Sequence, residues 1–456
     1  MHIPSHGTIN DYLNKTFSCS CNKEHLAPIK FISIDENALR YLKELLSEND
    51  LHKSFLIFDK TTFSIAGEKV YSTMEEASLR YTGHILSGEK PVPDENAIGD
   101  ILIHFDSECD HIIAVGSGTV NDLSRFISYR LRLPYMIIAT APSMDGFAST
   151  VAPLIVNHMK TTYEAHAPFA ILGDTGILRE APMKMLAAGI GDILGKYSSL
   201  CEWQISHIVT EEYYCPEIVK LVRHSIEVVV ANISSAGQRE PAAVKSIMEA
   251  LVLSGIAMSF AKNSRPASGS EHHLAHYWEM LALFQGEEPF LHGTEVGIGT
   301  IAVLKAFELL RNKEIDFAAA KEKAAGFSAD EWNSFIESAY LKASEAVIDL
   351  EKKTGKNAPA NVLPRIDMLK ANWHTLQKLA SSLPPADEVS SYLSLLGAPV
   401  NPMSIGIEKA AFMNSFMIAK DLRNRYGLLQ ILFDLGLTQE IAEQVWEYFS
   451  DTAQAE

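Results

Sequence analysis

The chain has 456 residues, 47% hydrophobic and 21% charged, which is typical of a soluble globular protein with two or more domains. Its net charge of −18 opposes general binding to nucleic acid or to an anionic membrane. The N-terminus lacks a basic stretch followed by an apolar one, and no run of about 18 apolar residues occurs. We therefore expect a cytoplasmic protein without a signal peptide or a transmembrane helix.

The first feature along the chain is a segment that carries Cys19, Cys21 and His25. The chain has five cysteines, an odd and sparse set that favours a reducing compartment over a disulfide framework. Three such residues could hold a metal, but structural zinc takes four ligands and a fourth is missing here. A solvated terminal arm is therefore the favoured interpretation.

Up to about residue 175, short apolar runs alternate with amphipathic stretches such as 36–46 and 119–131. This alternation is typical of a mainly parallel sheet with helices on both faces. The expected strands are 29–34, 55–58, 101–105, 111–115, 135–139 and 169–172.

After about residue 176 the strand signal disappears and helical patterns follow one another. The sequence therefore predicts a Rossmann-like α/β domain over residues 1–175 and an all-α domain over residues 176–456. The expected helices lie near 183–205, 213–235, 241–263, 270–284, 293–312, 329–350 and 404–423.

A glycine turn, Gly116-Ser-Gly118, connects the strand at 111–115 to a helix. Residues without a Cβ let a pyrophosphate approach the backbone, and the free amides of a helix start point toward it. Thr119 can add a hydroxyl. Alone this is a weak signal, because Asn121 stands where G-x-G-x-x-G has its third glycine.

Two further polar groups follow predicted strands in the first half. The loop 140–149 lies after the strand at 135–139, at the sheet edge where ligands of α/β proteins gather. Asp59 follows the strand at 55–58. Its carboxylate fits two interpretations equally well, an acceptor for ribose hydroxyls and a turn or helix cap.

Three segments of the second half carry residues that can bind a metal. Asp192 interrupts a small, apolar stretch, His272 and His276 share a helical face, and His292 opens a glycine-spaced helix. Singly, each histidine fits an ordinary interior or surface residue. Jointly, Asp192, one histidine of the pair and His292 form a set that leaves coordination positions open, as a catalytic metal requires.

The motifs at 140–146, 187–192, 268–272 and 291–296 occur together in this order. They resemble the sn-glycerol-1-phosphate dehydrogenases, and specifically their bacterial branch, over roughly residues 28–425. These enzymes share the dehydroquinate synthase-like fold with iron-type alcohol dehydrogenases and glycerol dehydrogenases. The resemblance implies a homodimer with an N-terminal α/β domain and an all-α C-terminal domain.

The resemblance also implies residue roles. Asp192, His272 and His292 would bind one divalent metal, zinc or nickel, which this ligand set does not distinguish. Asp145, Asp192 and His276 would contact the substrate. The NAD(P) site would comprise Asp59, Gly116, Ser117, Gly118, Thr119, Val120, Asn121, Asp122, Thr140, Ala141, Pro142, Ser143 and Ser149.

The implied reaction is reversible reduction of dihydroxyacetone phosphate to sn-glycerol 1-phosphate, by hydride transfer at a metal-polarised carbonyl. His276 is the candidate for proton delivery or substrate orientation. The candidates for binding the phosphate are Lys196, Lys262 and Arg265, with Lys160 a weaker one.

Three alternatives remain open. A glycerol dehydrogenase would use the same metal and cofactor without a phosphate pocket. A dehydroquinate synthase-like lyase resembles this chain less, because a glutamate would stand in place of Asp192. A non-enzymatic nucleotide-binding protein would leave Asp192, His272 and His292 without a purpose.

Overall fold

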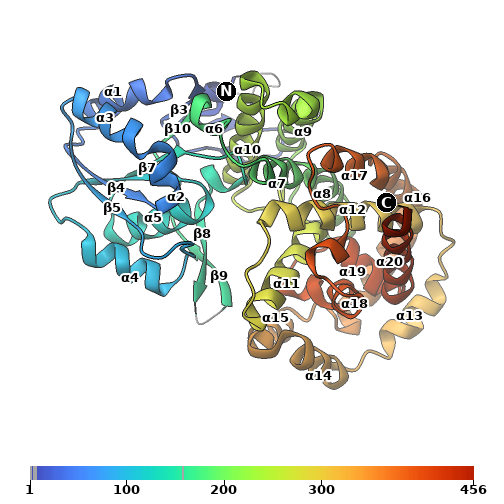
Figure 1. Cartoon of the computed structure of the whole chain (residues 1–456). Coiled ribbons are helices and arrows are strands. Elements are labelled where there is room, and N and C mark those ends of the chain that lie inside the picture. Colours follow the sequence, from blue (N-terminus) through green and yellow to red (C-terminus); the bar gives the residue numbers. More distant parts are fainter. Residues whose placement is uncertain (1–2, 4–7, 157–158, 456) are drawn as a thin grey trace. The chain divides into compact units, whose positions relative to one another are not determined.

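A computed structural model describes the chain except for residues 1–2, 4–7, 157–158 and 456 (Figure 1). The chain divides into two compact units. The first comprises Met1–Ile193 and Pro216–Asn263, and the second Leu194–Cys215 and Ser264–Glu456. The first unit thus extends beyond the expected boundary at residue 175.

The first unit is built on a six-stranded sheet in the order β3-β10-β7-β6-β4-β5. All neighbouring strands of this sheet are parallel. Its central strands are buried at every position and are therefore continuously apolar instead of alternating. The strands are β3 (Phe31–Asp35), β4 (Lys53–Phe58), β5 (Arg80–Ile85), β6 (His111–Gly116), β7 (Tyr135–Ala139) and β10 (Ala170–Asp174).

Helices cover this sheet. An apolar cluster joins α1 (Leu42–Glu48) and α3 (Glu68–Glu76) to alternate residues of the strands, among them Leu56 and Ile113. The helix α5 (Gly118–Leu131) packs directly against strands β4, β6 and β7. The helix α4 (Glu95–His104) packs against α5. Between β4 and α3 lie α2 (Lys60–Thr62) and a π-helical turn (Phe63–Gly67).

Five of the six expected strands are confirmed, and the strand expected at 101–105 is wrong. Those residues lie almost entirely in α4, which Asp94 begins by accepting a hydrogen bond from the Ala97 amide at 2.9 Å. The edge strand β5 was not predicted because its positions are half-buried or exposed. An antiparallel pair, β8 (Val151–Val156) and β9 (Met159–Glu164), was not predicted either.

Four further helices of different lengths belong to the first unit. They are α6 (Thr175–Leu178), α7 (Met183–Leu194), α9 (Pro216–Gly237) and α10 (Pro241–Ala261). By length and composition α10 could cross a membrane, but 67% of its most apolar window is buried. It packs against α9, α6, β3 and the turn Gly146–Ala148, so we interpret it as a core helix. This packing explains why α9 and α10 belong with the sheet.

Residues 8–25 fold as part of the first unit, so the expectation of a solvated arm around Cys19, Cys21 and His25 is wrong. A turn at Ile9–Tyr12 precedes a short hairpin of β1 (Phe17–Ser18) and β2 (Glu24–His25). Phe17 and His25 are fully buried. The Phe17 ring packs edge-on against Phe260 of α10, with centroids 5.7 Å apart.

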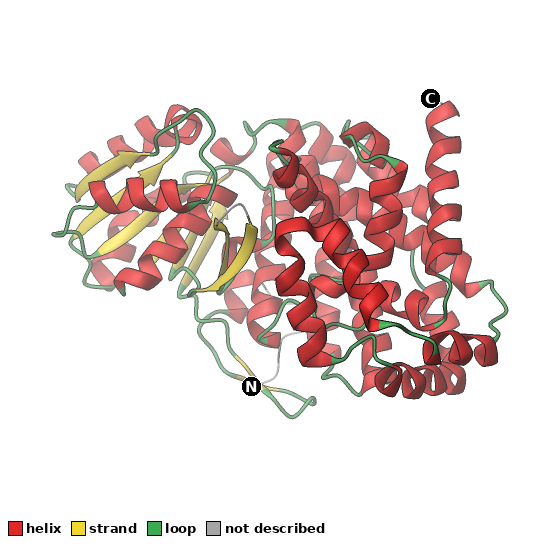
Figure 2. Cartoon of the chain, turned by 90° about the horizontal axis from the view of Figure 1, so that it is seen from below, coloured by secondary structure: helices red, strands yellow, loops and turns green. Residues whose placement is uncertain are grey.

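The second unit contains no strand among its described residues, which confirms the expected helical C-terminal region (Figure 2). The predictions near 270–284 and 293–312 correspond to α11 (Ser270–Gln285) and α12 (His292–Arg311), which pack together. The prediction near 183–205 divides into α7 and α8 (Lys196–Thr210). The remaining helices are α13 (Phe317–Ala325), α14 (Ala329–Tyr340), α15 (Ser344–Thr354), α16 (Pro359–Ser381), α17 (Ala386–Ser394), α18 (Lys409–Ile418), α19 (Leu428–Asp434) and α20 (Thr438–Ala455), with 3-10 turns at Leu341–Ala343, Pro402–Ile405 and Ala419–Leu422.

Candidate functional site

The glycine turn lies between the end of β6 and the start of α5, as the sequence predicted. A Cβ on Gly118 would meet no atom within 4 Å, whereas one on Gly116 would lie 2.6 Å from Cβ of Val120. Gly116 is therefore needed for packing, and Gly118 borders open space. Because the first amides of a helix have no acceptor within the helix, this space can hold a phosphate.

Asn121 and Asp122 follow in the first turns of α5, and they differ in their partners. Asn121 is fully buried, and neither side-chain polar atom has a hydrogen-bond partner among the described residues. A buried amide without hydrogen bonds destabilises the folded state unless a ligand forms hydrogen bonds with it. The Asp122 carboxylate instead accepts a hydrogen bond from Arg125 at 2.7 Å, so it supports the fold of the site.

Arg125 is a residue that sequence reasoning missed. It is fully buried, and its Nε donates to the Tyr135 hydroxyl at 2.8 Å. Its guanidinium also donates to the carbonyl oxygens of Val151, Phe147 and Gly146. Burial raises the pKa of Tyr135 to about 12, so this hydroxyl stays protonated at neutral pH. Arg125 thereby fixes the loop that follows β7.

The loop 140–149 begins beside the glycine turn. The Thr140 amide donates to the Gly116 carbonyl at 3.0 Å, and Thr140, Ala141, Pro142 and Ser143 are buried. Both candidate cofactor segments thus lie at the same edge of the sheet, where the sequence placed them. The Ser149 hydroxyl bonds to the backbone of Val151 in both directions, each at 3.1 Å.

Asp59 caps the short helix α2. Its Oδ1 accepts from the Thr62 amide at 2.7 Å, and its own amide donates to the Thr62 hydroxyl at 2.9 Å. The helix-cap interpretation is therefore confirmed. Contact with a ribose remains a prediction.

Asp192 and Asp145 lie together in the first unit. Asp192 is fully buried near the end of α7, and its Oδ2 accepts from the Asp145 amide at 3.0 Å. The Asp145 carboxylate accepts from the Ser254 hydroxyl at 2.9 Å. A Cβ on Gly189 would lie 2.1 Å from the Pro142 carbonyl oxygen, so this glycine lets α7 approach the loop. The small, apolar stretch noted in the sequence thus packs closely around the buried Asp192 carboxylate.

In the second unit, α11 and the start of α12 bring three imidazoles together. The His292 ring centroid lies 5.2 Å from those of His272 and His276, which are 6.2 Å apart. His276 and His292 stack with an angle of 16° between their planes. The sequence predicted the shared face of His272 and His276 and grouped His292 with this pair, and the three rings lie together in the structure.

Two glutamates determine how these imidazoles are protonated. Glu279 accepts from Nδ1 of His276 at 3.0 Å and from Nδ1 of His292 at 2.9 Å. Glu271 lies 2.9 Å from Nδ1 of His272. An ionised carboxylate only accepts hydrogen bonds, so each Nδ1 carries the hydrogen and each Nε2 presents a lone pair. Metal-binding histidines commonly have such a partner behind them.

Glu271 is itself held firmly. Burial raises the pKa of its carboxyl, but hydrogen bonds from His272, Ser198 and the Gly269 amide outweigh burial and leave that pKa lowered. The Ser198 hydroxyl donates at 2.6 Å and the Gly269 amide at 2.6 Å. Sequence reasoning missed both glutamates. Their signal was a carboxylate directly before His272 and another three residues after His276.

The basic residues expected near a substrate phosphate have varied surroundings. Arg265 is buried and donates to both carboxylate oxygens of Glu212 and to the Tyr426 carbonyl, so it has a structural role. Lys196 is fully buried, whereas Lys262 is exposed at the end of α10. The side chain of Lys160 lies outside the described residues.

The charges of three further cations, Lys356, Arg423 and Arg425, act on His273 of α11. Burial lowers the pKa of His273 well below its usual value, and the charges of these three residues lower it further. Burial lowers the pKa of Arg425 to about 9, with the charges of Arg423 and Arg265 acting in the same direction. Burial also lowers the pKa of Arg423. We call Lys356, Arg423 and Arg425 the cationic cluster; Lys356 also lies 3.7 Å from the Asp421 carboxylate.

Comparisons with known proteins agree with this fold. The family model described as iron-containing alcohol dehydrogenase matches residues 33–182. A solved structure described as a probable glycerol dehydrogenase from Sinorhizobium meliloti superposes with a TM-score of 0.61 at 16% identity. It covers 93% of this chain and 98% of that chain, and it shows the fold alone.

Closer relatives show the family. The glycerol-1-phosphate dehydrogenase (NAD(P)+) of Geobacillus stearothermophilus is 31% identical over 94% of this chain and 98% of its own length. The protein of the same name from Halalkalibacterium halodurans is 36% identical over 65% of this chain and 76% of its own length. These matches confirm the resemblance inferred from the four motifs: the chain belongs to the glycerol-1-phosphate dehydrogenase family, on the fold of the iron-containing alcohol dehydrogenases.

Proposed function

We propose that this chain is an NAD(P)-dependent dehydrogenase that interconverts dihydroxyacetone phosphate and sn-glycerol 1-phosphate. The observation that carries the proposal is the group of three imidazoles whose Nδ1 atoms are all held by carboxylates. Such an arrangement suits a divalent metal at the Nε2 side. The relatives named glycerol-1-phosphate dehydrogenase support the substrate and the cofactor.

Asp192, His272 and His292 are the proposed metal ligands. Carboxylates hold the Nδ1 atoms of the two imidazoles, so Nε2 is the ligand atom of each, and Asp192 offers a buried carboxylate. Asp192 also lies two residues before the chain enters the second unit at Leu194. When bound, zinc or nickel would supply Lewis-acid polarisation of the substrate carbonyl.

The proposed NAD(P) site lies along the edge of the sheet in the first unit. The amides after Gly118 would bind the pyrophosphate, and residues 140–143 would line the same edge. The buried Asn121 amide would gain the partner that it lacks among the described residues. The cofactor's nicotinamide supplies the hydride chemistry, and the protein supplies its position.

His276 is the proposed proton donor and acceptor. Its Nδ1 is held by Glu279, and its side chain is 21% exposed. A neighbouring carboxylate stabilises the protonated imidazole, so Nε2 can hold a proton and deliver it to the substrate oxygen. In the oxidation direction the same nitrogen would accept that proton. Asp145 would help to orient the substrate.

We assign the substrate phosphate to Arg423 of the cationic cluster. Arg425 already donates to the Ser268 carbonyl and the Ser264 hydroxyl, and Lys356 donates to the carbonyl oxygens of Lys420 and Arg423. The turn Ala419–Leu422 before Arg423 packs against α11, the helix of His272 and His276. A charged group at this position would attract an anion despite the net charge of −18. We further propose a cytoplasmic homodimer, which the family resemblance alone supports.

The cofactor placement predicts the effect of Gly118→Val. We expect the dissociation constant for NADH to rise at least tenfold, because the added side chain would fill the open space at the start of α5. Fluorescence titration measures this constant. Gly99→Val is the matched control, since a Cβ there also meets no atom within 4 Å. An unchanged constant for Gly118→Val would rule out this placement.

The metal assignment predicts that His292→Ala loses one equivalent of metal and its activity while keeping the wild-type circular dichroism spectrum. Removal of one of three ligands leaves too few donors to retain the ion. His374→Ala, on the exposed side of α16, serves as the control and should match wild type. Full metal content in purified His292→Ala would show that the ligand set is wrong.

The substrate assignment predicts that kcat/KM for dihydroxyacetone phosphate exceeds that for dihydroxyacetone by about tenfold to a hundredfold or more. One charge-assisted hydrogen bond to the phosphate contributes about 1.5–3 kcal/mol, which corresponds to that ratio. Arg423→Gln should lower the efficiency with the phosphorylated ketone at least tenfold and spare the other. Arg223→Gln, exposed on α9, is the control. Equal wild-type efficiencies would favour a glycerol dehydrogenase.

A further inference from the structure

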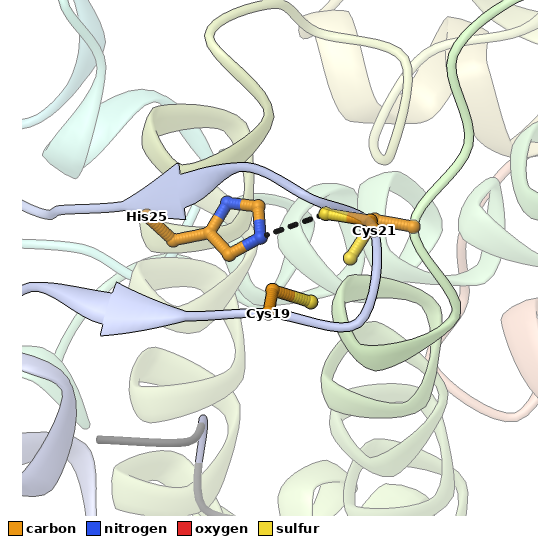
Figure 3. Close-up of side chains that lie close together, drawn as sticks. Cys19, Cys21 and His25 are labelled. Atoms are coloured by element: carbon orange, nitrogen blue, oxygen red, sulfur yellow. Dashed lines mark hydrogen bonds between the residues drawn. The ribbon is translucent and has the colours of Figure 1, made fainter.

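The N-terminal hairpin brings two thiols and an imidazole together, far along the chain from the proposed catalytic residues. Phe17 of β1 pairs with His25 of β2, Cys19 follows β1 directly, and Cys21 lies in the connecting loop. Figure 3 shows the side chains of Cys19, Cys21 and His25 close together. The Cys21 sulfur lies 3.3 Å from Nε2 of His25, and one donor atom from each residue lies within 4.8 Å of the others.

The protonation of His25 is fixed by the backbone of α10. Its Nδ1 lies 2.9 Å from the carbonyl oxygen of Phe260, and the ring is fully buried. A carbonyl oxygen only accepts, so Nδ1 carries the hydrogen and Nε2 presents its lone pair toward Cys21. A backbone carbonyl behind Nδ1 is a common partner of a metal-binding histidine.

Two helices of the first unit, α9 and α10, connect Cys215 to the neighbourhood of His25. The helices α9 and α10 have 22 and 21 residues, are joined by residues 238–240 and pack against each other. A hairpin of two helices that differ by one residue in length places the start of α9 beside the end of α10, where the Phe260 carbonyl contacts His25. Cys215 is covalently bonded to Pro216, the first residue of α9, and it is fully buried.

We propose that Cys19, Cys21, His25 and Cys215 form a structural zinc site. Zinc bonds of about 2.3 Å to sulfur and 2.0–2.1 Å to nitrogen place tetrahedral sulfur and nitrogen ligands roughly 3.6 Å apart, close to the separation of Cys21 and His25. Four protein ligands close the coordination sphere, so this site stabilises structure and does not bind substrate. Binding converts the three thiols to thiolates and releases their protons.

Metal analysis of the full-length protein, purified with zinc present, tests this site. We expect wild type to contain two metal equivalents and Cys19→Ser/Cys21→Ser to lack one equivalent of zinc while keeping its dehydrogenase activity. Cys215→Ser should lose the same zinc. Cys109→Ser, a buried cysteine on another part of the first unit, is the matched control and should keep both metals. Full metal content in the double variant would overturn the proposal.

Two further readouts separate this site from the proposed catalytic metal. Cobalt-loaded wild type should show thiolate-to-metal charge-transfer absorption, which His292→Ala should keep and the double cysteine variant should lose. Wild type without such absorption would contradict the proposal. After denaturation and chelation without reductant, all five cysteines should titrate as thiols. A count of three would instead indicate a disulfide and would also contradict it.

Discussion

One carboxylate, Glu279, determines the chemical state of two histidines. Because both of its oxygens accept from imidazole Nδ1 atoms, His276 and His292 must both present Nε2 away from it. The proposed roles of metal ligand and proton carrier require these two histidines to react differently, although both are imidazoles. The proposed division assigns His292 to the ion and His276 to the proton, and it requires that both rings are held in one tautomer first.

The first unit uses a buried cation for a similar purpose. Arg125 is surrounded by carbonyl oxygens of residues 146, 147 and 151 and by the Asp122 carboxylate. The loop after β7 therefore has a defined shape before any ligand binds. Since Asp145 lies in this loop and its amide donates to Asp192, the position of the proposed carboxylate ligand also depends on Arg125.

Much of the fold could be predicted, because apolar runs such as β6 and β7 are local features of the sequence. The strand predicted at 101–105 is wrong because its apolar run is short and lies in a helix that Asp94 caps at its N-terminus. The half-exposed β5 carries no such run. The burial of the N-terminal hairpin depends on Phe260, more than 230 residues later, which no local pattern reveals.

The candidate site shows the same limit. Motifs identified Asp192, His272, His276 and His292, since histidine and aspartate in apolar helices are conspicuous. Glu271 and Glu279 look like ordinary helix residues until their distances to the imidazoles are known. Arg265 was favoured for its place in the chain, yet its guanidinium is paired with Glu212, and only the folded structure could show this.

The central claim is that carboxylate-fixed imidazoles make the metal site, and Glu279→Gln tests it most directly. A glutamine oxygen can accept from one Nδ1, while its amide group would face the other and disfavour that tautomer. Competition with a chelator should show metal binding weakened about 10- to 100-fold, with an unchanged circular dichroism spectrum. The exposed Glu287→Gln is the control and should bind as wild type does. Wild-type affinity in Glu279→Gln would contradict the account.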